Sequence, residues 1–106
     1  MISQKVLRIV GNSEFSQLSG CMIYLFDRID LYNMTHLRPF AIGDKPIFKT
    51  ASVIYLDRSC HEDFVYYHIR RESFPNVKDL YIDCHEGITK EQFHTCDIHL
   101  NKFYYD

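Results

Sequence analysis

The 106-residue chain has no tryptophan, only four glycines and three prolines, and no run of like charge. The four glycines are scattered and supply no phosphate cradle, which is one argument against an enzyme. The 12 basic and 14 acidic residues give a net charge of −2, so the basic footprint of a nucleic-acid-binding protein is missing. We therefore expect no nucleic-acid partner.

Long hydrophobic runs are lacking too. The apolar stretch that starts at Val6 ends after about five residues at Gly11, far short of a signal-peptide core or a membrane span. We therefore expect a soluble, intracellular protein without a membrane partner. Disulfides are rare in that compartment, so free thiols are expected at the four cysteines, which are Cys21, Cys60, Cys84 and Cys96.

Aromatic and aliphatic residues are abundant by contrast. Eight tyrosines and eight phenylalanines belong to a hydrophobic fraction of 46%, against 25% charged residues. This balance is ordinary for a globular protein and argues against disorder. A chain of this length has room for one core, so we expect a single domain over residues 1–106.

Short apolar segments bounded by polar or turn residues predict five strands. They are Val6–Val10, Met22–Phe26, Val53–Leu56, Leu80–Ile82 and Ile98–Leu100. Three of them have an aliphatic-Tyr-aliphatic centre, at Tyr24, Tyr55 and Tyr81. Because successive side chains of a strand point to opposite faces, the aliphatic residues are expected in the core and the three tyrosines in a row on the outer sheet face.

Helices are expected between the later strands. Segment 60–72 has acidic residues in its first turn and Arg70-Arg71 in its last, as the helix dipole favours, and a shorter helix is expected over 87–93. Strands that alternate with helices predict an α/β fold with parallel pairing and right-handed crossovers. The stretch 30–49 contains two prolines and a glycine and is expected to be an irregular insertion.

A short pattern occurs twice. The apolar positions of 51–56 reappear in 77–82 at a constant offset of 26 residues (51 to 77). The spacing Val77-x-x-Leu80-x-Ile82, led by Phe74-Pro75-Asn76, resembles the leucine-rich repeat, in which a strand with inward-facing leucines is followed by a variable return. The resemblance implies a short stack of about five mostly parallel strands with helices or loops on the return side.

Two features depart from that family. The position of its characteristic asparagine is occupied by Ser59 and His85. The other predicted strands lie about 16, 31 and 18 residues apart, whereas repeats of this family span roughly 20–29 residues. The alternative is an ordinary small α/β domain in which two strands look alike.

The run from Phe74 to Tyr81, together with the abundance of isoleucine and tyrosine, is also similar to small repeat-like proteins of large DNA viruses. This resemblance implies a minor virion protein or a viral accessory protein. The virion is then the alternative to a cytoplasmic location.

Cysteine and histidine occur as adjacent pairs after two of the strands. Candidate ligands for a tetrahedral zinc site are Cys60, His61, Cys84, His85, His94 and Cys96. Neighbours in an extended segment point to opposite faces, however, and no Cys-x-x-Cys knuckle is present. No cofactor is therefore expected, and a small zinc-stabilised domain is the second hypothesis.

A cysteine nucleophile with a histidine base is the third hypothesis. Cys60 or Cys84 at the start of a helix would have a lowered pKa. No oxyanion loop or orienting residue accompanies them in the sequence, so an enzyme is not expected.

The tyrosine row is the favoured candidate site. Tyr24, Tyr55 and Tyr81 form the amphipathic surface that protein interfaces prefer. The alternative is that segment 30–49 or the C-terminal Phe103-Tyr104-Tyr105 folds over this face and makes it core. We therefore predict a non-enzymatic protein–protein interaction module that binds a protein partner through this face, with self-association as a further expectation.

Overall fold

The computed structural model describes residues 4–18, 23–41, 43–83, 88, 91, 98 and 102–105. Its elements, in chain order, are β1 (Val6–Val10), α1 (Asn12–Ser16), β2 (Ile23–Tyr24), β3 (Arg28–Tyr32), β4 (Ile47–Phe48), β5 (Val53–Leu56), α2 (Glu62–His68), β6 (Asp79–Ile82) and β7 (Lys102–Tyr105). Five of these strands form one sheet and two form another.

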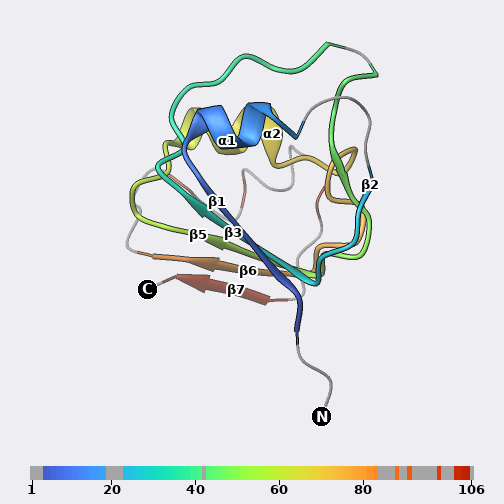
Figure 1. Ribbon diagram of the computed structural model, residues 1–106. Helices are drawn as coiled ribbons and strands as arrows, with labels where there is room; N and C mark the ends of the chain where they lie inside the picture. Colours follow the sequence, from blue (N-terminus) through green and yellow to red (C-terminus); the bar gives the residue numbers. More distant parts are fainter. Residues whose placement is uncertain are drawn as a thin grey trace.

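The large sheet has the strand order β1-β3-β5-β6-β7, and every neighbouring pair is parallel. The short strands β2 and β4 pair in parallel with each other. Figure 1 shows α1 and α2 on the same side of the large sheet. A parallel sheet covered by helices is an α/β arrangement, which confirms the α/β class and the parallel pairing predicted from the sequence.

The register of the large sheet shows that the chain returns at nearly regular intervals. One row across the sheet consists of Val6, Arg28, Val53, Asp79 and Lys102. Successive members of the row are 22, 25, 26 and 23 residues apart, by difference of their residue numbers. The pairing of Ile54 with Leu80 confirms the predicted 26-residue offset. We call each strand and the return segment that follows it a coil.

Strand β3 corrects the sequence prediction. The segment 30–49 was expected to be an irregular insertion, but it contains the end of β3 and all of β4, so the irregular chain is limited to 33–46. Ile29 and Leu31 of β3 are fully buried, while Arg28, Asp30 and Tyr32, which alternate with them, are only half-buried. The predicted strand 22–26 is the two-residue β2 of the second sheet, which explains the uneven strand intervals expected from the sequence.

The core lies between the large sheet, the helices and the second sheet. The large sheet contributes a ladder of inward aliphatic side chains, which are Ile9, Ile29, Leu31, Ile54, Leu56, Leu80 and Ile82. Phenylalanine rings fill the return side, where Phe48 stacks on Phe74 at 4.8 Å and Phe15 meets Phe64 edge-on at 4.9 Å. Full burial of each such side chain is worth about 1.5–3 kcal/mol, so these residues dominate the stability of the fold.

Hydrogen bonds outside the strands also link each coil to the next. Asn76 Nδ2 donates to the Lys49 carbonyl at 2.6 Å, and Thr50 Oγ1 donates to the Phe26 carbonyl at 3.1 Å. Both bonds join residues about one coil apart, so they support the same register as the strand pairing.

The first helix lies next to the outer edge of the sheet. Strand β1 ends the strand order, so one of its edges has no neighbour among the described strands. The Gly11 amide donates to the Tyr32 carbonyl of the neighbouring strand at 2.8 Å. The preceding amide, of Val10, points the other way and donates to the Glu14 carboxylate of α1 at 2.6 Å.

Helix α2 is shorter than the helix predicted over 60–72. It begins after His61, whose Nδ1 accepts the amide of Asp63 at 3.1 Å, and ends at His68. Ile69 leaves the helical conformation, at φ −90° and ψ 78°, and its side chain is fully buried. Among the described residues, no helix is long and apolar enough to cross a membrane.

The C-terminal predictions are tested only in part. The fifth strand begins at Lys102, whereas the sequence predicted a strand over 98–100. Ile98 is buried in the core outside any strand, and residues 99 and 100 lie outside the described part of the chain. Most of the helix predicted over 87–93 also lies outside it.

Candidate functional site

Alternate side chains of the large sheet point away from the core and form a surface that we call the outer face. The pattern continues one residue past β5 and β6, because the amides of Asp57 and Asp83 still donate to the preceding strand of the sheet, at the Leu31 and Leu56 carbonyls, at 3.0 Å each. The outer face consists of Val6, Arg8, Val10, Arg28, Asp30, Tyr32, Val53, Tyr55, Asp57, Asp79, Tyr81 and Asp83. Each of these residues is exposed or half-buried.

Two of the three predicted tyrosines lie on the outer face. Tyr55 and Tyr81 are direct partners across β5 and β6. The prediction that Tyr24 shares their row is wrong, because β2 pairs with β4 in the second sheet. The ring of Tyr24 stacks on Phe48 at 5.4 Å, and its hydroxyl donates to the Leu18 carbonyl at 3.2 Å. Tyr24 therefore belongs to the return side of the coils.

Arginine side chains on the outer face lie over tyrosine rings, which the sequence reasoning missed. The guanidinium of Arg8 lies 4.4 Å from the ring centroid of Tyr32, and that of Arg28 lies 5.5 Å from the centroid of Tyr55. Arg28 Nε also donates to Asp30 Oδ1 at 2.6 Å. These cation–π and charge-assisted contacts hold the long side chains against the sheet.

A sequence signal for these arginines exists. The run Arg28-Ile29-Asp30-Leu31-Tyr32 alternates polar and apolar residues, which is typical of a half-buried strand. Its charged residues belong to the outer face and its aliphatic residues to the core.

The centre of the outer face is acidic. Burial raises the pKa of the Tyr55 hydroxyl, and the carboxylates of Asp83, Asp57 and Asp30 raise it further. The pKa of Asp57 is lowered, chiefly because its carboxylate accepts the Ser59 hydroxyl at 2.6 Å. Tyr55 therefore stays a neutral phenol at neutral pH.

The described residues of segment 33–46 do not cover the outer face. The Leu37 carbonyl bonds to His68 of α2 at 2.8 Å, and the Phe40 ring stacks on Phe15 at 5.8 Å, so this segment packs on the helix side. Strand β7 extends the sheet next to β6 and places Tyr104 in register with Tyr81. The part of 30–49 that the structure describes thus leaves the outer face open, and the strand 102–105 continues the sheet.

Cys60 and His61 point into different surroundings. The Cys60 side chain is buried, and its Sγ donates to the Leu31 carbonyl at 3.2 Å. Burial raises the pKa of this thiol to about 11, so the lowered pKa predicted for Cys60 is wrong. His61 is exposed and caps α2. The pair therefore cannot bind one metal ion together without rearrangement.

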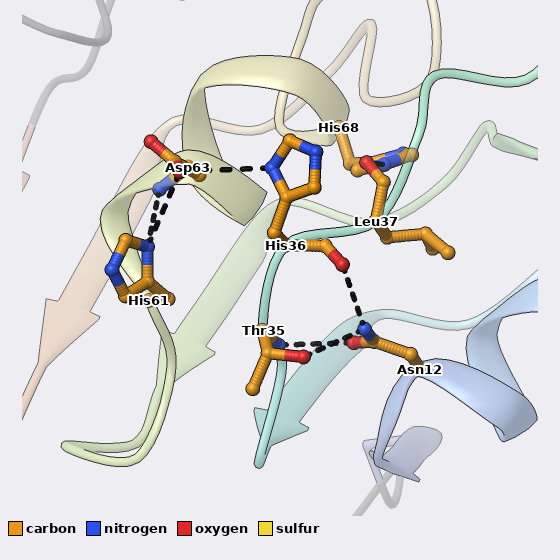
Figure 2. Close-up of polar contacts among 7 residues, drawn as sticks. All are labelled: Asn12, Thr35, His36, Leu37, His61, Asp63 and His68. Carbon is orange, nitrogen blue, oxygen red and sulfur yellow. Dashed lines mark hydrogen bonds and ion pairs between the residues drawn. The ribbon is translucent and has the colours of Figure 1, made fainter.

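Figure 2 shows His61 and His36 on either side of Asp63 at the start of α2. Their Nδ1 atoms lie 3.8 and 3.6 Å from Asp63 Oδ2, and all three side chains are at least half exposed. His68 points instead toward the Leu37 carbonyl. Within the described ranges, no three His, Cys, Asp or Glu side chains are arranged to hold a metal ion.

The remaining zinc candidates lie outside the described residues. These are Cys84, His85, His94 and Cys96. The zinc site and the nucleophile at Cys84 stay predictions of the sequence.

A cavity of about 210 Å³ is lined mainly by the segment that connects α2 to β6. Its lining includes Arg71, Phe74, Asn76, Lys78 and Ile98. Sites for small ligands usually measure about 300–1,000 Å³, so this cavity is small for one. The outer face remains the best candidate site.

Comparison with known proteins gives a family and no function. A family model described as a family of unknown function (DUF5845) matches residues 29–105, and the chain belongs to that family. The match begins within β3 and reaches β7. No curated protein and no solved structure matches the chain.

Proposed function

We propose that this DUF5845 member is a non-enzymatic protein–protein interaction module, built as a short leucine-rich-repeat-like stack, that binds a protein partner around Tyr55 and Tyr81. The observation that carries the proposal is a row of tyrosine, arginine and aspartate side chains on an open sheet face. Tyrosine and arginine are enriched among the residues that contribute most to binding energy at interfaces.

The register supports a stack of repeated coils. Its intervals of 22, 25, 26 and 23 residues fall inside the roughly 20–29 residues of the leucine-rich repeat. The strand order follows the chain order, so each coil packs on the coil before it and the coil after it. An array of this kind presents one continuous sheet face to a partner.

Contacts within the outer face also restrain its side chains. Arg28 is held by both Asp30 and Tyr55, and the Tyr32 and Tyr55 ring centroids lie 5.8 Å apart. Side chains fixed in this way lose less conformational entropy on binding than free ones, which favours affinity.

The decisive experiment uses the double variant Tyr55→Ala/Tyr81→Ala. The matched control is Tyr66→Ala/Tyr67→Ala, which removes two exposed tyrosines of α2 on the helix side of the sheet (Figure 1). Proteins from the cells in which the chain occurs are passed over immobilised wild type and both variants. We expect a partner that the wild type and the control retain and the outer-face variant loses.

Thermal and urea unfolding of the same variants test whether the face is a surface. Each outer-face substitution should cost less than about 1.5 kcal/mol, since a core aromatic would cost about 3–5 kcal/mol. Unfolding of the Tyr55→Ala/Tyr81→Ala protein, or retention of every partner by it, would contradict the proposal. A virion or accessory role and self-association stay predictions of the sequence.

A further inference from the structure

The imidazole ring of His68 uses one of its two nitrogens. Nε2 donates to the Leu37 carbonyl at 2.8 Å, whereas Nδ1 has no hydrogen-bond partner among the described residues. The residue is only 4% exposed, yet no side-chain nitrogen or oxygen in the described part of the chain is both buried and without a partner. Nδ1 is therefore reached by solvent, and the opening is a small cavity that His68 lines.

The same cavity exposes a second buried polar residue. Ser73 is 6% exposed, and its Oγ has no hydrogen-bond partner among the described residues, so this hydroxyl also reaches solvent there. The cavity has room for about one water-sized atom. It is lined by Phe40, Lys45, Tyr67, His68, Arg70 and Ser73.

The surroundings of the cavity are positively charged. Lys45 is half-buried and forms no ion pair with a described residue. Arg70 donates to the Tyr66 carbonyl at 3.0 Å and keeps this bond, so it contributes its charge rather than a free donor. None of the described residues that line the cavity carries a carboxylate. Burial lowers the pKa of His68, and the charges of Lys45 and His36 lower it further, which is the effect of a positive field at the ring.

Protonation of His68 changes what the cavity can hold. In the neutral ring Nδ1 is an acceptor, which disfavours an anion, and in the protonated ring it is a donor. The groups that α1 and α2 pack on the imidazole are the rings of Phe15 and Phe64, which carry no counter-charge. Because a buried charge is costly unless it is paired, a protonated His68 favours an anion in the cavity.

We propose that this cavity binds one oxygen of an oxyanion, which is a carboxylate or a tetrahedral group such as sulfate, together with a proton on His68. Nδ1 of the protonated ring, the Ser73 hydroxyl and the Lys45 ammonium donate to that oxygen, and the rest of the oxyanion stays in solvent at the mouth. A chloride ion is larger than an oxygen atom and fits less well. The site adjoins α2 on the helix side of the sheet (Figure 1), so it is independent of the interaction function proposed for the outer face.

Titration with sulfate tests the proposal, because sulfate stays doubly charged at every pH used. The dissociation constant is measured from the NMR signals of the His68 ring at pH 7.5 and pH 5, with sodium chloride exchanged for sulfate at constant ionic strength. Proton and anion binding assist each other equally, so sulfate should bind about fivefold or more tightly at pH 5. Formate in place of sulfate shows whether the site prefers a carboxylate or a tetrahedral oxyanion.

Variants of the protein locate the site. Ser73→Ala removes the hydroxyl and Lys45→Gln removes the ammonium charge, and each should weaken sulfate binding at pH 5 about fivefold, as expected for the loss of a charge-assisted hydrogen bond. Lys5→Gln removes the same charge from an exposed position before β1 and is the matched control. It should leave the affinity within about twofold.

Three results would overturn the inference. The first is a His68 signal that does not change when chloride is exchanged for sulfate or for formate. The second is equal sulfate affinity at pH 7.5 and pH 5. The third is sulfate binding that both Ser73→Ala and Lys45→Gln leave unchanged, which would show an adventitious ion only. None of these results affects the capture of a partner by the outer face, so the two proposals fail separately.

Discussion

At the scale of single residues, His68 carries a titratable group inside the aromatic core. Its ring packs against Phe64 at 4.9 Å and against Phe15 and Phe40 at 5.4 Å each. Nε2 lies 2.8 Å from the Leu37 carbonyl, which fixes the proton on that nitrogen in the neutral ring. Burial lowers the pKa of His68 below its ordinary 6.5, against the opposing effect of the Leu37 hydrogen bond.

The first prediction is a loss of stability in mild acid. Well above pH 6.5 His68 is neutral in both the folded and the unfolded chain, so its contribution to stability is intact. As the pH falls below 6.5, the unfolded chain binds the proton first, and the free energy of unfolding decreases until the folded pKa is passed. Urea unfolding between pH 7.5 and 5 should show this decrease in the wild type and a smaller one in His68→Gln.

The control for this prediction is His61→Asn. It replaces an exposed histidine, and its side-chain oxygen can still cap α2. The control should keep the wild-type pH dependence. If the free energy of unfolding depends on pH equally in the wild type and in His68→Gln, a group other than His68 causes the loss of stability in acid.

The second prediction concerns the reactivity of Cys60. Because the thiol is buried and its pKa is about 11, it is a protonated and inaccessible group at pH 8. Iodoacetamide should modify Cys60 only after unfolding in urea, as measured by peptide-resolved mass spectrometry. Modification of Cys60 in the native protein within minutes would show that the thiol is accessible to reagents, and this result would support the nucleophile hypothesis.

At the scale of elements, the sequence predicts the strands with aliphatic centres and misses the amphipathic ones. Strands β1, β5 and β6 are apparent in the sequence because their apolar residues dominate short windows. Strand β3 is missed because Arg28 and Asp30 make it look like a loop, although its alternation is regular. The prediction for Tyr24 is wrong for the same reason. Because β3 is not recognised in the sequence, the segment that contains β2 is assigned to the large sheet instead.

Part of the candidate site can also be predicted from the sequence. The alternation of side chains along a strand places Tyr55 and Tyr81 on one face without any tertiary information. The Arg8–Tyr32 and Arg28–Tyr55 contacts depend on the register between strands, which arises from the lengths of the intervening returns.

The third prediction tests how the first coil is attached to the second. Asn12 Nδ2 donates to Thr35 Oγ1 at 2.8 Å and to the His36 carbonyl at 3.2 Å, and Asn12 Oδ1 accepts the Thr35 amide at 3.0 Å (Figure 2). Asn12→Ala should cost about 1–2 kcal/mol and accelerate hydrogen exchange of the Thr35 amide. Ser13→Ala, at an exposed neighbouring position, should change neither quantity measurably. Unaltered Thr35 exchange in Asn12→Ala would contradict the bridging role.

At the scale of the whole molecule, regular returns of the chain generate the fold. Each strand of the large sheet pairs with the strands of the adjacent coils, and bonds such as Asn76 to Lys49 repeat that relation on the return side. In the leucine-rich-repeat-like stack that we propose, stability would be close to a sum of coil and interface contributions. The protein should therefore tolerate the addition of a whole coil.

The fourth prediction follows from that regularity. A variant in which residues 53–78 are duplicated in tandem adds one coil of 26 residues, since Val53 pairs with Asp79. We expect a folded protein whose scattering profile is longer by about one strand spacing of 4.8 Å and whose β-sheet circular dichroism increases in proportion. An insert of the same composition in scrambled order is the control and should lower the unfolding temperature. Equal behaviour of the two inserts would argue against a stack of repeated coils.

The bond between Glu14 and Val10 has a consequence for how such an array ends. A parallel sheet that grows by one strand per coil has no intrinsic last strand, so an uncovered edge is a template for a foreign strand. At the β1 edge the Val10 amide is already occupied by a carboxylate. A strand from another molecule that is to bond to the Val10 amide must first displace this carboxylate, so Glu14 should disfavour strand docking at this end of the β1 edge.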